Sequence, residues 1–225
     1  MPEEQLPKIS PKFEMVRLGE EVPSDFRLER LKHWCNLFDT NNLAPPYDGG
    51  SFGNLSFRVR EGELPFIITG TNIGLKNRLE NEHFVLVERV DFENTKVFYR
   101  GARKPSSESM VHAAVYSHFP LVGAVFHGHH NGILAYTHWI EAPITAKEEP
   151  YGTLELVRQV QTLLRQLQPN PSNSPGMFNM KNHGFVAYGR TMDETGEHVS
   201  SVLAKVNKLT SQQNVPGSNE GHPFG

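Results

Sequence analysis

The chain has 225 residues, a formal net charge of −3 and a single cysteine, Cys35. Its length suits one α/β domain that buries its own hydrophobic core. A near-neutral charge without a basic cluster argues against nucleic acid as a partner, a lone cysteine excludes an intrachain disulfide, and no apolar run approaches the roughly 20 residues that span a bilayer.

The first half of the chain predicts one helix and then a meander of strands. Residues 1–22 show no periodicity, so we expect a loose lead-in without the basic and apolar parts of a signal peptide, in a cytoplasmic protein. Pro23-Ser24-Asp25 is a helix-start signal, and apolar residues at helical spacing carry the helix to about Asp39. Four runs bounded by turn residues then predict antiparallel strands: NLSFRV, LPFIIT, HFVLVERV and TKVFYR.

The second half alternates helices and strands. KPSSESMVHAAVYSHF predicts a helix capped by serine, LVGAVFHGH a buried strand, TLELVRQVQTLLRQL an amphipathic helix and NMKNHGFVAYG a further strand. Thr191 and Glu194 form a capping box that opens a helix to about Thr210, before a loose tail. This order predicts one domain over residues 1–225, with a core at about 23–210 in which helices cover a mostly antiparallel sheet.

The strongest chemical signal is His127-Gly128-His129, at the end of the apolar run LVGAVF. Side chains two residues apart in a strand point to one face, so we expect the two imidazoles to converge, with Gly128 removing bulk between them. Neutral imidazole is a good ligand for zinc and its first-row neighbours, although an exposed histidine turn is the alternative. His130 is expected to point the other way, either in a structural role or as a residue that supports the metal ligands.

Four weaker signals accompany it. The helix start Pro105-Ser106-Ser107-Glu108 offers free N–H groups and hydroxyls that suit an anion such as phosphate, or it is a plain helix cap. The segments Gly53-Asn54-Leu55-Ser56 and Thr69-Gly70-Thr71-Asn72 can wrap an anion or form ordinary turns. In Lys181-Asn182-His183-Gly184, a lone histidine before glycine is usually structural.

Read together and in this order, the five fragments resemble the class II aldolase/adducin family, from about residue 28 to about residue 210. The resemblance implies a three-layer α/β/α fold with a mostly antiparallel central sheet. It also implies a homotetramer with active sites at subunit interfaces, and zinc or another divalent transition metal on His127, His129 and His183. Glu108 would touch the resting metal and move protons during turnover.

The resemblance further implies a substrate and a reaction. The family's phosphate-binding positions fall on Gly53, Asn54, Thr71, Ser106 and Ser107. We therefore expect a lyase that cleaves or forms a C–C bond through a metal-bound enediolate of a small sugar or hydroxy-keto substrate, phosphorylated or not. A metal-dependent decarboxylase or dehydratase on the same scaffold, and a non-catalytic adducin-like interaction domain, are the alternatives.

Two departures from the family pattern bear on these alternatives. Asn72 stands where the aldolases usually have glycine. The stretch after His130 is shorter than in the aldolases, which carry there a tyrosine thought to protonate the leaving aldehyde. Tyr136 and Tyr151 are candidates for that role by composition only.

Overall fold

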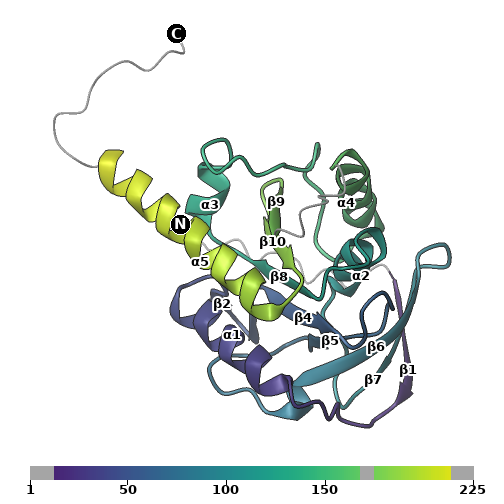
Figure 1. The fold of residues 1–225 in the computed structure, drawn as a ribbon. Helices are drawn as coiled ribbons and strands as arrows, with labels where there is room; N and C mark the ends of the chain where they lie inside the picture. The colour runs from purple at the N-terminus through teal and green to yellow at the C-terminus, as the bar shows by residue number, and fades with distance from the viewer. Residues whose placement is uncertain (1–12, 168–174, 214–225) are drawn as a thin grey trace.

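The computed structural model describes residues 13–167 and 175–213, which are built around one eight-stranded sheet (Figure 1). Its strands are β1 (Glu14–Gly19), β4 (Asn54–Arg58), β5 (Phe66–Thr69), β6 (Phe84–Asp91), β7 (Lys96–Arg100), β8 (Ala124–Gly128), β9 (Gly176–Met180) and β10 (Gly184–Gly189). Their order across the sheet is β1-β7-β6-β5-β4-β8-β10-β9. The pair β1–β7 is parallel and the other neighbouring pairs are antiparallel, which confirms the predicted meander and the mostly antiparallel sheet.

Helices cover both faces of the sheet. They are α1 (Leu28–Thr40), α2 (Ser109–His118), α3 (Asn131–Ala135), α4 (Leu154–Gln166) and α5 (Met192–Gln213), with a short 3-10 turn, η1 (Asn81–His83). In β8 and β10 alternate residues enter different cores: Phe126 and Phe185 pack with α1, α3 and α5, whereas Val125 and Val186 pack with α2 and α4. The predicted three-layer α/β/α architecture is therefore confirmed. A small hairpin of β2 (Pro46–Tyr47) and β3 (Gly50–Ser51) lies outside the main sheet.

The predicted loose lead-in is wrong for residues 14–19, which form the edge strand β1. Its backbone pairs with β7 in parallel register, with Met15 opposite Val97. The side chains of β1 are half-buried or exposed, so the strand has no apolar face that sequence periodicity could report. Residues 1–12, residues 168–174 and the predicted tail from residue 214 lie outside the described residues.

The helix boundaries depart from prediction in two places. We expected a serine to cap α2, but Glu108 occupies the N-cap position and no side chain caps that end of the helix. The Thr191 hydroxyl accepts from the Glu194 N–H at 3.1 Å, as the capping box predicts, while α5 continues past Thr210 to Gln213. In the described part of the chain, no helix is long and apolar enough to cross a membrane.

Gly196 allows α5 to approach α1. A Cβ atom at this position would lie 2.3 Å from ring atoms of Trp34, whose side chain is buried. We expect Gly196→Ala to lower the free energy of unfolding by about 1–2 kcal/mol, because overpacking outweighs the better helix propensity of alanine. Denaturant unfolding measures this, with Ser201→Ala on the exposed face of α5 as the control. An unchanged midpoint for Gly196→Ala would contradict the close packing of the two helices.

Candidate metal centre

His127 and His129 come from the end of β8, in the middle of the sheet. His127 is fully buried on β8 between Asn54 of β4 and Val186 of β10. The strand ends at Gly128, so the expectation that both histidines share one strand is wrong: His129 follows it, and its N–H donates to the Leu43 carbonyl at 2.8 Å. The two rings nevertheless converge, with their Nε2 atoms 3.0 Å apart.

Gly128 is required for a different reason from the one expected. A Cβ atom here would lie 2.6 Å from the ring of Phe185 and 2.9 Å from the Leu43 carbonyl oxygen. The glycine thus lets the chain pass between the Phe185 ring and the Leu43 backbone, rather than clearing space between the two imidazoles. That passage positions His129 against His127.

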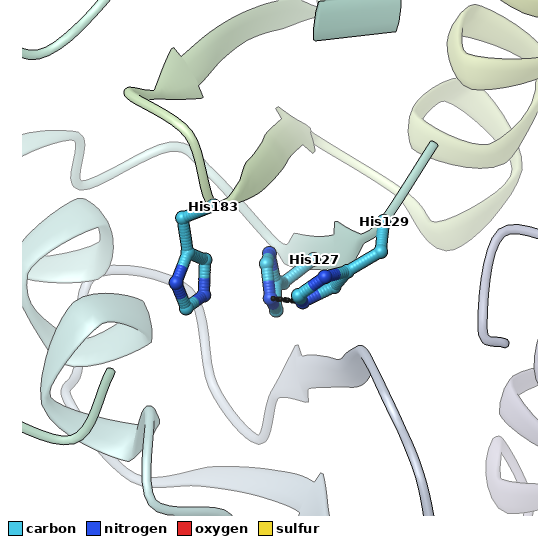
Figure 2. Close-up of side chains that lie close together, drawn as sticks. All are labelled: His127, His129 and His183. Atoms are coloured by element: carbon cyan, nitrogen blue, oxygen red, sulfur yellow. Dashed lines mark hydrogen bonds between the residues drawn. The ribbon is translucent and has the colours of Figure 1, made fainter. Parts of the chain in front are cut away.

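His183 reaches the same place from the other side. The segment predicted as one strand is a hairpin, in which β9 and β10 are joined by a turn that carries His183, and Asn182 adopts a left-handed φ of 54°. The ring of His183 lies 5.2 Å from that of His127 and 5.0 Å from that of His129, between centroids. Figure 2 shows the three rings facing one another, and one ligand atom from each residue lies within 4.8 Å of the others.

The hydrogen bonding and burial of these rings suit a cation. The Nδ1–H of His127 donates to the Phe185 carbonyl at 2.8 Å, which directs Nε2 of the same ring toward the cluster. Burial, together with His127 and His183, lowers the pKa of His129 to about 2, so this ring is neutral. Three imidazoles that converge at such spacing are a donor set for zinc and its first-row neighbours, which imidazole binds in its neutral form.

Glu108 closes the remaining side of the cluster. Its Oε1 lies 2.8 Å from Nε2 of His183, its Oε2 lies 3.0 Å from Nε2 of His127, and Oε2 also accepts from Nδ2 of Asn54 at 2.8 Å. Burial raises the pKa of the Glu108 carboxyl, but charges and hydrogen bonds from His127 and His183 hold it well below its usual value. Glu108 is therefore a buried carboxylate directed at the imidazoles rather than at the helix end.

The segments predicted to bind phosphate lie around this carboxylate. An isolated bridge pairs Gly70 with Pro105 and so joins the Thr71 segment to the Ser106 segment, where the Ser106 hydroxyl accepts from the Glu108 N–H at 3.2 Å. Gly53 has a φ of 72°, and a Cβ atom there would lie 2.7 Å from the His127 carbonyl oxygen. Ser107 is half-buried in the same turn.

Two asparagines in these segments behave differently from one another. Both polar atoms of the Asn54 side chain are engaged by buried neighbours, Glu108 and His112, so this amide faces the interior. Asn72, at the position where the aldolases usually have glycine, has a left-handed φ of 54° and is exposed. Asparagine adopts that conformation more easily than other residues with a side chain, which explains how it replaces glycine there.

The two candidate tyrosines, Tyr136 and Tyr151, differ in their surroundings. Tyr151 is half-buried, and its ring centroid lies 6.5 Å from that of His183. Tyr136 is buried and packs against Trp139. His130 caps α3, since its Nδ1 accepts from the Ile133 N–H at 3.3 Å, in line with the expected structural role.

His112 is a residue of this region that the sequence reasoning missed. It lies four residues after Glu108, on α2, fully buried, with Nε2 2.6 Å from Oδ1 of Asn54. Residues four apart on a helix share a face, and that spacing from Glu108 was the available signal. His112 is flanked by apolar residues of α2, so the sequence alone did not mark it as part of a site.

Comparisons with known proteins show the family of the chain. The family model described as "Class II Aldolase and Adducin N-terminal domain" matches residues 30–203. A methylthioribulose-1-phosphate dehydratase of Geobacillus kaustophilus is 28% identical over 192 residues, covering 76% of this chain and 88% of the relative. The protein of the same name from Exiguobacterium sp. is 23% identical over 178 residues, covering 71% of this chain and 84% of the relative.

Solved structures show the same fold. An L-fuculose 1-phosphate aldolase superposes with a TM-score of 0.63 and 21% identity, covering 87% of this chain and 91% of its own. The L-fuculose-1-phosphate aldolase of Thermus thermophilus gives a TM-score of 0.60 and 20% identity, covering 85% of this chain and 96% of its own. At these identities the similarity demonstrates the fold alone.

Proposed function

The chain belongs to the class II aldolase and adducin family, and from that premise we propose that it is a metal-dependent lyase acting on a small phosphorylated ketose. The relatives named as dehydratases support the lyase type at a coarse level. One observation carries the proposal: three imidazoles and a buried carboxylate, from three segments that are remote in sequence, meet at one point.

His127, His129 and His183 would hold the metal, zinc or another divalent transition metal. When bound, such a metal supplies a Lewis acid that stabilises negative charge on the substrate oxygens. The protein keeps the Nε2 atom of His127 available by holding Nδ1–H on the Phe185 carbonyl. Burial of His127 and Glu108 keeps bulk water from their polar atoms, which strengthens the electrostatic interactions within the site.

Glu108 is the base in this proposal. Its carboxylate takes the proton from the carbon next to the substrate carbonyl, and the electron pair of that C–H bond moves toward the carbonyl oxygen. In an elimination, the C–O bond at the neighbouring carbon then breaks, and the departing hydroxyl leaves as water with the proton that Glu108 held. His127 and His183 hold the pKa of Glu108 well below its usual value, so the group is an ionised carboxylate in the resting site.

The names of the sequence relatives favour elimination of water, since those from Geobacillus kaustophilus and Exiguobacterium sp. are both named dehydratases. Cleavage of a C–C bond is the second candidate. It is favoured by the glutamate at position 108, as in the aldolase pattern, and by the ring of Tyr151, 6.5 Å from that of His183, which would supply a proton to a leaving aldehyde.

Two further properties complete the proposal. A substrate phosphate would be bound by Gly53, Thr71, Ser106 and Ser107, in the segments that surround Glu108. We also propose that the chain is a cytoplasmic homotetramer with its sites at subunit interfaces, as the family resemblance implies. Light scattering coupled to size-exclusion chromatography measures the mass of the assembly.

Removal of the metal is expected to abolish turnover. Protein purified without chelator should contain close to one divalent ion per chain by mass spectrometry. Dialysis against a chelator should remove both the ion and the activity, and zinc or manganese should restore the activity. Full activity in metal-free protein would overturn the metal-dependent mechanism, and bound metal without turnover of any sugar phosphate would favour the non-catalytic domain.

The products decide between the two reactions. Methylthioribulose 1-phosphate and fuculose 1-phosphate are the two probes, taken from the names of the relatives and of the solved structures. A dehydratase converts the first to a product lighter by one water, whereas an aldolase splits the second into an aldehyde and a smaller ketose phosphate. Both outcomes are read by mass spectrometry of the reaction mixture.

A further inference from the structure

A line of buried polar side chains leads from Glu108 into the core between the sheet and α2. From the cluster inward its members are Asn54, His112, Ser56 and Tyr116, each 5% exposed or less. The contact from Glu108 Oε2 to Asn54 Nδ2 is 2.8 Å, and that from Asn54 Oδ1 to His112 Nε2 is 2.6 Å. His112 Nδ1 then lies 2.7 Å from Ser56 Oγ, which lies 2.8 Å from Tyr116 Oη.

The acceptor at one end determines the direction of every hydrogen bond in this line. A carboxylate only accepts, so Asn54 presents its NH₂ group to Glu108 and its carbonyl oxygen to His112. The Nε2 atom of His112 must then carry a proton and donate. With Nε2 protonated in a neutral ring, Nδ1 accepts from the Ser56 hydroxyl, and the Tyr116 hydroxyl donates to Ser56.

The protonation states of the two inner groups agree with this direction. Burial lowers the pKa of His112 to about 3, so the ring is neutral and has one donor and one acceptor. Burial raises the pKa of Tyr116, so its hydroxyl keeps the proton that it donates. Each group in the line therefore donates toward Glu108.

We propose that His112 is a positioning residue that acts on Glu108 through Asn54, with Ser56 and Tyr116 holding its tautomer. The Nε2–H of His112 donates to the side-chain carbonyl of Asn54 and fixes the orientation of that amide. The NH₂ group of Asn54 therefore faces the carboxylate of Glu108. If the amide turned over, its carbonyl oxygen would face Oε2 of Glu108 and two acceptors would meet. The line thus keeps Glu108 turned toward His127 and His183, a role that rests on the proposed function of Glu108 as the base.

The tautomer of His112 is a direct test that needs neither metal nor substrate. The chain holds eleven histidines, so the His112 signals are assigned by their loss in His112→Gln. Solid-state nitrogen-15 spectra of histidine-labelled protein should show His112 as a neutral ring protonated at Nε2. A ring protonated at Nδ1 instead, or at both nitrogens at neutral pH, would overturn the proposed direction of the line.

Three variants test the effect on Glu108. His112→Phe removes both ring nitrogens and should lower kcat about 10- to 100-fold with little change in KM, the usual effect of losing a supporting partner. His112→Gln places an amide donor where Nε2 lies and should recover most of that loss. Tyr116→Phe removes only the outermost donor and should lower kcat roughly two- to tenfold.

Tyr99→Phe is the matched control. Tyr99 is equally buried, at 2% exposed, and its hydroxyl accepts from Arg17 on the far part of the sheet, outside this line. Equal kcat values for Tyr116→Phe and Tyr99→Phe, or no recovery in folded His112→Gln, would overturn the role of the line. Cobalt(II) titration supplies a readout besides activity, and His112→Phe should bind the ion about tenfold more weakly.

The activities of Glu108→Gln and His112→Phe distinguish a failure of this inference from a failure of the proposed function. If Glu108→Gln turns over like the unmodified protein, the base assignment fails and the positioning role fails with it. If Glu108→Gln is inactive while His112→Phe is folded, fully active and binds cobalt(II) normally, the proposed function stands and the inference is overturned.

Discussion

Glu108→Gln is expected to keep the metal and to lower turnover by about 10²–10⁴-fold, which is the range that a positioned general base contributes. Glutamine has the shape of glutamate, and its amide oxygen can still accept from Nδ2 of Asn54. It has no basic oxygen that takes up a proton, so the C–H bond of the substrate would stay intact. Steady-state kinetics measure the loss, and metal content is determined on the same sample.

Glu155→Gln is the control for this experiment. Glu155 lies in the first turn of α4, near a helix start as Glu108 does, but it is exposed and outside the cluster, so its substitution should leave kcat unchanged. Equal activity of Glu108→Gln and the unmodified protein would remove Glu108 as the base. Complete loss of metal in Glu108→Gln would instead assign the carboxylate as a ligand that the three imidazoles cannot replace.

The layers of the fold were predictable because their signals are local. Short runs of β-branched and aromatic residues between turn residues mark β4 to β7, and the helical stripe of α1 is apolar enough to be recognised without any tertiary information. β1 was not predictable, since it is held by backbone hydrogen bonds to β7 and leaves its side chains half-buried or exposed. An edge strand of this kind depends on a partner remote in the chain.

The candidate site was also predictable only in part. The motif around His127 is visible in the sequence, whereas the place of His129 depends on a backbone hydrogen bond to Leu43 and on the space beside Phe185. His183 was expected on a strand, but a tight turn with Asn182 in the left-handed region carries it to the other histidines. Such convergence is a property of the folded sheet, and only the family resemblance suggested it beforehand.

The polar line behind Glu108 shows why the sequence analysis was incomplete. His112 stands among apolar residues of α2, where a histidine is indistinguishable from an ordinary buried polar residue in the sequence. Its role depends on Asn54 and Ser56, which lie two residues apart on β4 and therefore face the same side of the sheet. Each residue type was visible, but the register that aligns β4 with α2 exists only in three dimensions.

His183→Ala is expected to weaken divalent-metal binding by more than about 100-fold, because even the loss of a partner outside the ligand set costs 10- to 100-fold. The substitution is suited to the test since the His183 side chain is 11% exposed in a turn, so its removal leaves the paired strands intact. Isothermal titration with zinc or cobalt(II) measures the affinity, and thermal unfolding of the metal-free protein confirms that the variant is folded.

His33→Ala controls for a general effect of losing a histidine, because His33 is exposed on α1 and lies outside the cluster. Its metal affinity should equal that of the unmodified protein. If His183→Ala bound the ion as tightly as the control, the turn between β9 and β10 would contribute no ligand. The cation would then rest on His127, His129 and Glu108 alone, and the three-histidine centre would have to be replaced by one with two imidazoles and a carboxylate.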